Sequence, residues 1–379
     1  MLSLALAALL ATPAELVLPW GAGPAAPSAA DHVATVAVDP GYGHEPREQR
    51  YELTRSGTWL REVRGGAISH RDFASGVSIE YGAGNAPGNW GFSINRHASN
   101  EVYRFSRVRT DERDRLLGEE CFVWRFERVG ATQGDLAYLS CETADGIQLW
   151  ARTLSGQTGH VLASSRTLSF ARRPVAAAEV LPPWGRLRWR SWRALAGPAE
   201  RAAPPSNRPP DYEVRLAGRG EGAQQAQILR ASRGWTYAES RWRHMRSMMI
   251  RSIAVAIDYR EDSDGRPLSL TVRPISAAER QVVPPPLPEG PLAPPIDRVI
   301  GEDCSWAEPR PGPAIVVTSG TNRRCITRDG LPLRIIYGDR GPVTNLTATH
   351  IARRPLPMRA LEPPRSAFSW FAWGLRPAN

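Results

Sequence analysis

The chain contains no lysine. All 48 of its basic residues are arginine, against 38 aspartates and glutamates, so the net charge is +10. This choice is typical of a GC-rich genome, because arginine codons are GC-rich. A surface with arginine alone favours bidentate contacts with carboxylates and phosphates. The simpler interpretation is a solvated basic surface. With 42% hydrophobic and 23% charged residues over 379 positions, the composition excludes a disordered chain and fits two globular domains.

Catalytic motifs are also absent from the sequence. It has no G-x-S-x-G, H-E-x-x-H or P-loop pattern, and no G-x-G-x-x-G between a strand and a helix. The histidines follow no metal-ligand spacing, and no C-x-x-C pair exists to hold zinc. We therefore predict no catalytic residue, no metal site and no cofactor. An enzyme with dispersed catalytic residues is the least favoured of three possible functions.

Long apolar runs are missing except at the start, MLSLALAALLATPA. This run has the length of a signal peptide and ends in small residues, although no lysine or arginine precedes Arg47. It is broken by Pro13 and too short to span a bilayer. Cleavage could follow Ala14 or Ala30. We expect residues 1–30 to be a signal peptide and a disordered segment, and the protein to be exported, periplasmic or secreted, in a Gram-negative bacterium.

Several short blocks occur twice, in the same order. DRLLGEEC (114–121) matches DRVIGEDC (297–304), CETADGIQL (141–149) matches CITRDGLPL (325–333), and ARRP (171–174) recurs at 352–355. Blocks that keep their order and spacing indicate a tandem duplication. We predict β-rich domains over 31–195 and 209–366, a proline-rich linker over 196–208, and an aromatic C-terminal tail over 367–379.

The sequence of each copy predicts a mostly antiparallel sheet. Short strand-like runs alternate with turn signals such as Asp145-Gly146 and Asp329-Gly330, which favour hairpins. The four cysteines fall two per copy. A hairpin centred near residue 131 would bring Cys121 opposite Cys141, within disulfide range. The sequence therefore predicts the bonds Cys121–Cys141 and Cys304–Cys325; free buried cysteines in a cytosolic protein are the alternative.

Two sets of residues are candidates for a site. The repeated Glu119 and Glu302 suggest catalytic acids. The favoured interpretation is structural: the glycine before each glutamate begins the strand, and the glutamates contact Arg115 and Arg298. Aromatic and basic residues also interleave in PPWGRLRWRSWR (182–193), a composition that suits phosphate-rich partners or packing on the domain. The predicted binding residues there are Trp184, Trp189, Trp192, Arg186, Arg188 and Arg190.

The order of these blocks resembles exported domains of the LolA/LolB/LppX-like superfamily. In each copy a strand-rich front precedes a G-E-x-C strand, a paired strand, a D-G turn and a last hairpin that ends in a proline motif. The resemblance implies an unfinished β-barrel, in which a curved antiparallel sheet wraps an apolar cavity covered by helices. No binding residue of that superfamily is transferred to this chain.

Two functions follow from these features. The first is a non-enzymatic exported binding protein that holds an apolar or lipid-like ligand in curved sheets. The second is a cell-envelope scaffold whose arginine-rich surface contacts an anionic polymer, a membrane surface or a partner protein. Nucleic acid is a disfavoured partner because the protein is expected to be exported, and no transmembrane span is predicted.

Overall fold

A computed structural model describes thirteen stretches of the chain. They are residues 30–39, 49–82, 91–96, 105–128, 137–155, 158–184, 211–219, 226–232, 235–252, 255–275, 294–307, 323–337 and 344–375. The predicted signal peptide and the linker over 196–208 lie outside these stretches.

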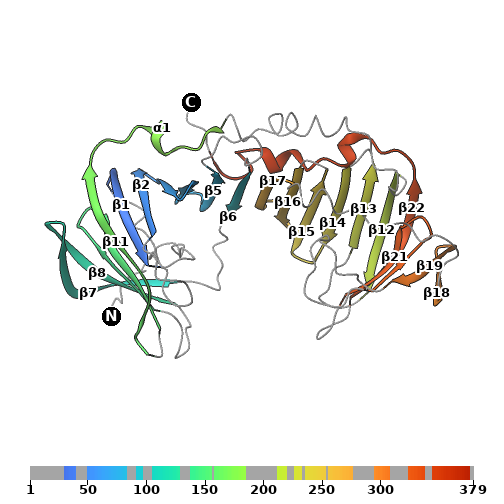
Figure 1. The fold of residues 1–379 in the computed structure, drawn as a ribbon, viewed down its shortest axis with the longest axis horizontal. Helices are drawn as coiled ribbons and strands as arrows, with labels where there is room; N and C mark the ends of the chain where they lie inside the picture. Colours follow the sequence, from blue (N-terminus) through green and yellow to red (C-terminus); the bar gives the residue numbers. More distant parts are fainter. Residues whose placement is uncertain are drawn as a thin grey trace, which may run out of the picture. The chain divides into compact units, whose positions relative to one another are not determined.

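Strands dominate the described residues (Figure 1). The first eleven are β1 (His32–Asp39), β2 (Gln49–Ser56), β3 (Trp59–Arg64), β4 (Ala67–Asp72), β5 (Val77–Gly82), β6 (Phe92–Arg96), β7 (Phe105–Leu116), β8 (Glu119–Arg128), β9 (Ala137–Glu142), β10 (Gln148–Leu154) and β11 (Val161–Arg172). The next eleven are β12 (Tyr212–Arg219), β13 (Ala226–Ser232), β14 (Trp235–Arg241), β15 (Met245–Arg251), β16 (Val255–Asp262), β17 (Pro267–Pro274), β18 (Ile296–Val299), β19 (Glu302–Ala307), β20 (Arg323–Ile326), β21 (Pro332–Tyr337) and β22 (Thr344–Arg353). Helices in these stretches are short: α1 (Ala177–Val180), η3 (Met358–Ala360) and η4 (Arg365–Phe368).

The chain divides into two compact units, and both contain an antiparallel sheet. Unit 1 comprises residues 1–83 and 97–182, and unit 2 comprises 84–96 and 183–379. In unit 1 the strands pair in the order β7-β8-β9-β10-β11-β1-β2-β3-β4-β5. In unit 2 the order is β18-β19-β20-β21-β22-β12-β13-β14-β15-β16-β17-β6. The predicted fold class, mainly β with duplicated antiparallel sheets, is confirmed.

The duplication extends to every described strand. β1 to β11 follow the same course as β12 to β22, and both β1 and β12 pair with the last strand of their copy across a bulge at the equivalent position. One strand departs from this scheme. β6 is the counterpart of β17, yet it pairs with β17 itself, with Phe92 opposite Val272. The sheet of unit 2 is therefore extended by a strand that precedes β7 in the sequence.

The repeated glycine occupies a turn rather than the start of a strand. Leu117 and Gly118, between β7 and β8, have φ values of 55° and 81°, and Ile300 and Gly301 between β18 and β19 have 45° and 84°. Two successive residues with positive φ are the signature of a type I′ hairpin. The prediction that glycine begins the strand was therefore wrong by one residue, since β8 begins at Glu119 and β19 at Glu302.

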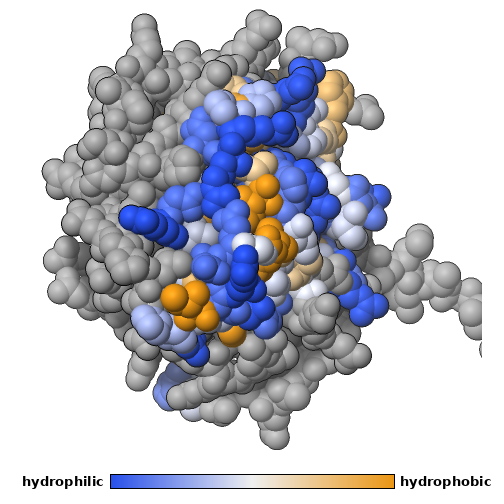
Figure 2. All heavy atoms as spheres, turned by 90° about the vertical axis from the view of Figure 1, so that its right-hand side faces the viewer, coloured by the Kyte–Doolittle hydropathy of each residue, from blue (hydrophilic) through white to orange (hydrophobic). Residues whose placement is uncertain are grey.

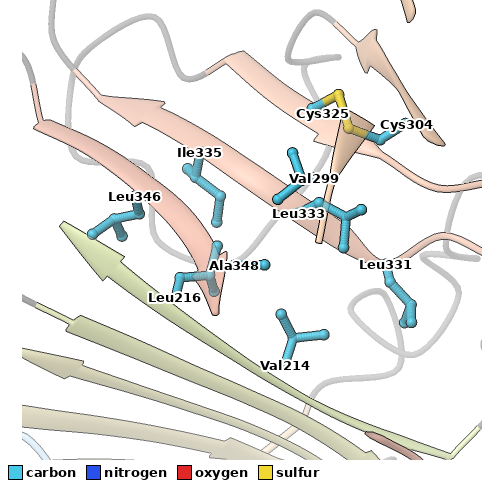
Figure 3. Close-up of a cluster of buried hydrophobic side chains, with 10 residues drawn as sticks. All are labelled: Val214, Leu216, Val299, Cys304, Cys325, Leu331, Leu333, Ile335, Leu346 and Ala348. Atoms are coloured by element: carbon cyan, nitrogen blue, oxygen red, sulfur yellow. A yellow bond between two sulfur atoms is a disulfide. The ribbon is translucent and has the colours of Figure 1, made fainter. Parts of the chain in front are cut away.

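The main core of unit 2 lies along one part of its sheet. Its buried cluster joins side chains of six consecutive strands in the sheet order, from β12 through β22, β21, β20 and β19 to β18. Figure 3 shows these side chains gathered between the strands. The members are Val214, Leu216, Val299, Cys304, Cys325, Leu331, Leu333, Ile335, Leu346 and Ala348. Figure 1 shows β18, β19 and β21 bending away from the row formed by β12 to β17, so the sheet of unit 2 is curved.

Candidate functional site

The three repeated sequence blocks of copy one meet at one arginine. Arg172, at the end of β11, donates Nη1 to Glu119 Oε1 at 2.9 Å and Nη2 to Glu119 Oε2 at 3.2 Å. Its Nε donates to Asp145 Oδ2 at 2.7 Å. Thr143 Oγ1 donates to the same aspartate and accepts from Ile147 N, which fixes the turn between β9 and β10. One guanidinium therefore links three strand ends.

Copy two builds the same cluster. Arg353 donates Nη1 and Nη2 to the two carboxylate oxygens of Glu302, both at 2.6 Å, and Nε to Asp329 Oδ2 at 2.6 Å. The expectation that Arg115 and Arg298 meet the repeated glutamates was wrong. Those arginines instead donate Nε to the turn carbonyls of Gly118 and Gly301.

The electrostatics of the two clusters are consistent with ion pairing. In unit 1 the hydrogen bond from Arg172 lowers the pKa of Asp145 to about 2. In unit 2 burial tends to raise the pKa of Asp329, but the hydrogen bonds from Arg353 and Thr327 offset this and lower it. The carboxylates and guanidiniums remain about a third exposed. Residues that are identical in both copies and bond to one another favour a structural role for these clusters, and the absence of catalytic residues stays a prediction.

Both predicted cysteine pairs are bonded in the structure. The Sγ–Sγ distance is 2.07 Å for Cys121–Cys141 and for Cys304–Cys325, with Cα atoms 5.3 and 5.2 Å apart. The expected facing arrangement was wrong, however. Cys141 lies opposite Val123, and Cys325 lies opposite Trp306, so each bond runs diagonally between adjacent strands. The turn over which the hairpin was centred, near residue 131, lies outside the described residues.

A polar row crosses the strands at each disulfide. In copy two Asp297 faces Cys304, and Cys325 faces Arg334, whose Nη1 donates to Asp297 Oδ2. Because directly opposite residues share a face of the sheet, the ion pair passes over the buried disulfide.

The same row in copy one has a different donor. Asp114 faces Cys121, Cys141 faces Trp150, and Trp150 Nε1 donates to Asp114 Oδ2 at 2.8 Å. The sequence alignment of the copies places Trp150 and Arg334 at equivalent positions. The aspartate is thus a shared feature, and its donor is specific to each copy.

The interleaved tryptophans and arginines are described only in part. Trp184 makes an edge-to-face contact with Trp370, with ring centroids 4.6 Å apart, which is a packing contact within unit 2. Trp189, Trp192, Arg186, Arg188 and Arg190 lie outside the described residues, so their role in binding stays a prediction.

A buried ion network in unit 2 was not foreseen from the sequence. Glu239, on β14, has a side chain 2% exposed and receives hydrogen bonds from Arg241 Nε, Arg246 Nε and Tyr237 Oη. Burial raises the pKa of Glu239, but these donors more than compensate and lower it to about 2. Arg246 also pairs with Glu261 at 2.8 Å. Neither β14 (WTYAESR) nor β15 (MRSMMIR) shows a sequence pattern that would have predicted it.

The described part of the chain holds no cluster of three or more His, Cys, Asp or Glu side chains with metal-binding geometry. Within the same stretches no helix has the length and apolar character needed to cross a bilayer.

No protein-family model and no curated protein matches this chain. Solved structures give weak matches. A chain of the MucA/MucB complex of Pseudomonas aeruginosa is 11% identical with a TM-score of 0.24, over 66% of this chain and 90% of that one. An uncharacterised conserved protein of Thermus thermophilus is 15% identical with a TM-score of 0.22, over 41% and 87%. A domain of Vibrio parahaemolyticus named after outer membrane lipoprotein sorting is 9% identical with a TM-score of 0.16, over 40% and 88%. These matches assign no function.

Proposed function

We propose that the protein is an exported, non-enzymatic binding protein, and that the curled sheet of unit 2 holds an apolar or lipid-like ligand. One observation carries the proposal: the buried cluster of unit 2 has an apolar rim that is only partly covered. Tyr212, Leu229, Trp306 and Ile351 pack against the cluster and keep part of their surface accessible. A ligand that covered this rim would extend the apolar core, at about 25 cal/mol per Å² of apolar surface removed from water.

The equivalent positions of the other copy favour unit 2 as the location. Leu346 and Ala348 of β22 belong to the buried cluster, and their counterparts in β11 are Ser165 and Thr167. The sheet of copy one is therefore more polar where copy two is apolar. Figure 2 views the side on which β18, β19 and β22 lie in Figure 1, where small groups of apolar residues are separated by hydrophilic ones.

A titration with a fluorescent fatty acid tests this assignment. We expect saturable binding to the full-length protein and at least a tenfold loss of affinity in Leu229→Asn. Leu53→Asn is the matched control, because Leu53 is the counterpart of Leu229 in copy one and is also partly buried. Equal losses in the two variants, with folding verified by circular dichroism, would contradict a ligand site in unit 2.

A second candidate is an envelope scaffold with an arginine surface for anionic partners. Arg109 and Arg113 on β7 lie over the ring of Phe122, with guanidinium carbons 3.7 and 5.2 Å from its centroid. Both arginines are exposed and restrained by stacking, and Arg113 also pairs with Glu120 at 3.1 Å. Binding to phosphatidylglycerol vesicles that falls with added salt and in Arg109→Gln/Arg113→Gln would favour this candidate. Binding unaffected by salt would exclude it.

A further inference from the structure

Unit 1 contains a surface pocket that the proposed apolar site does not include. It has a volume of about 390 Å³, within the range of about 300–1,000 Å³ usual for small-ligand sites. It forms where β1, β7, β10 and β11 approach one another. The lining consists of Ala37, Asp39, Asp114, Leu116, Trp150, Arg152, Ser164, Ser165 and Arg166.

The aromatic residue of the pocket is held in place on two sides. Trp150 Nε1 donates to Asp114 Oδ2 at 2.8 Å, which fixes one edge of the indole. The guanidinium carbon of Arg152 lies 4.6 Å from the indole centroid. This contact restrains the arginine as well as the ring, so its donors are presented to the pocket at a reduced cost in side-chain entropy.

The charges that line the pocket balance. Two arginines, Arg152 and Arg166, face two aspartates, Asp39 and Asp114, and Ser164 adds a hydroxyl. A simple anion would be attracted by the guanidiniums but repelled by the carboxylates. A simple cation would be attracted by the carboxylates but repelled by the guanidiniums. A neutral ligand can donate to the carboxylates and accept from the guanidiniums alongside the interactions that these groups make within the protein.

The comparison between the copies shows which pocket residues the fold does not require. Asp114 is retained as Asp297, but Trp150, Arg152 and Arg166 are replaced by Arg334, Ile336 and Thr347. In copy two Arg334 pairs with Asp297 directly. The same strands thus form with and without this combination of an indole and two further arginines, so the fold does not require it.

We infer that this pocket binds a saccharide. Adjacent hydroxyls of a sugar ring donate to a carboxylate and accept from a guanidinium in pairs, and the ring carries no net charge. The indole of Trp150 and the side chain of Leu116 provide apolar surface for the C–H face of the ring. One molecule of this class can therefore contact the aspartates, the arginines, the serine and the indole together.

Isothermal titration of the full-length protein with a panel of soluble oligosaccharides tests the inference. The panel spans neutral glucose-, galactose- and N-acetylglucosamine-based chains of two to six residues, together with uronic acid chains, glycine betaine and a phosphorylated short-chain amphiphile. We expect a neutral member to bind, and Arg152→Ile and Arg166→Thr each to lower its affinity at least tenfold. Both substitutions introduce the residue that copy two carries at that position, which favours a folded variant.

The matched controls are Arg334→Gln and Thr347→Ala in copy two, which should leave the affinity unchanged. Circular dichroism of each variant should match that of the unchanged protein. The inference is overturned if no saccharide of the panel binds, or if only the zwitterion, the amphiphile or the uronic acids bind. It is equally overturned if Arg152→Ile/Arg166→Thr binds saccharide as well as the unchanged protein does.

Discussion

Arg172 and Glu119 lie 53 residues apart in the sequence and are joined by two hydrogen bonds, of 2.9 and 3.2 Å. Their counterparts Arg353 and Glu302 repeat this pairing, with both bonds at 2.6 Å. In each copy the arginine belongs to the repeated A-R-R-P block and the glutamate to the repeated G-E-x-C block. The duplicated blocks therefore preserve a contact between distant strands.

Removal of the shared guanidinium should destabilise unit 2 modestly. Arg353→Gln loses its ion pairs to Glu302 and Asp329. Because these groups are about a third exposed, we expect the free energy of unfolding to fall by about 1 kcal/mol or less. Arg328→Gln is the control, since Arg328 is exposed and lines the same surface beside the cluster. Thermal unfolding followed by circular dichroism measures the difference; equal midpoints for the two variants would contradict this role of Arg353.

The ion pair over the disulfide of copy two should protect it from reductants. Asp297→Ala removes the partner of Arg334 and uncovers Cys304 and Cys325, which are 0% exposed in the intact protein. Thiol–disulfide exchange requires access to a sulfur, so native-state reduction by dithiothreitol should be faster in this variant. Arg298→Ala, an exposed neighbour, should leave the rate unchanged. If Asp297→Ala is reduced at the rate of the unchanged protein, the ion pair does not shield the bond.

A histidine should make unit 1 sensitive to mild acid. His70 is 1% exposed; its Nδ1 donates to Val180 O at 2.6 Å, and its Nε2 accepts from Tyr81 Oη at 2.9 Å. Burial lowers its pKa from the ordinary 6.5 to about 4, against the opposing effect of the Val180 hydrogen bond. The unfolded chain takes up a proton below pH 6.5 and the folded protein only near pH 4. The stabilisation is therefore present above pH 6.5 and is lost as the pH falls from 6.5 to 4.

Urea unfolding at pH 7 and pH 5 tests this sign. Between pH 7 and pH 5 we expect the free energy of unfolding to fall by about 2 kcal/mol more in the unchanged protein than in His70→Gln. This value follows from about 1.36 kcal/mol per unit of pKa shift. His160→Gln, at an exposed position, should behave as the unchanged protein does. An identical pH dependence in His70→Gln and the unchanged protein would show that His70 is not the group responsible.

The two disulfides give a direct chemical prediction. Because all four cysteines are paired in the structure, the denatured but unreduced protein should show no free thiol to a thiol reagent. Each bond should contribute about 3 kcal/mol through the loop it closes. Detection of four thiols before reduction would refute the pairing and, with it, the main argument for export.

Local and repeated features of the fold were predictable from the sequence. The repeated octets and the D-G dipeptides indicated the duplication, the hairpins and the cysteine partners, because each depends on residues close in the chain. The diagonal register of the cysteines was not predictable, since it depends on how the strands slide by two residues within the hairpin.

Contacts between distant strands could not be predicted from the sequence. The pairing of Glu119 with Arg172 requires that β11 returns beside the turn after β9, which no local pattern encodes. The pocket around Trp150 likewise draws on four strands, the first and last of which are separated by more than a hundred residues in sequence. Its sequence signal was the replacement of Trp150, Arg152 and Arg166 by Arg334, Ile336 and Thr347 in the second copy.

Native mass spectrometry of the protein purified from its native host tests the proposed function most directly. We expect a mass increment above that of the disulfide-bonded chain, which organic extraction removes and identifies as an apolar or lipid-like molecule. The increment should be present in Leu53→Asn and reduced in Leu229→Asn. Repeated preparations that contain the bare chain alone, and extracts without any such molecule, would refute the proposed binding function.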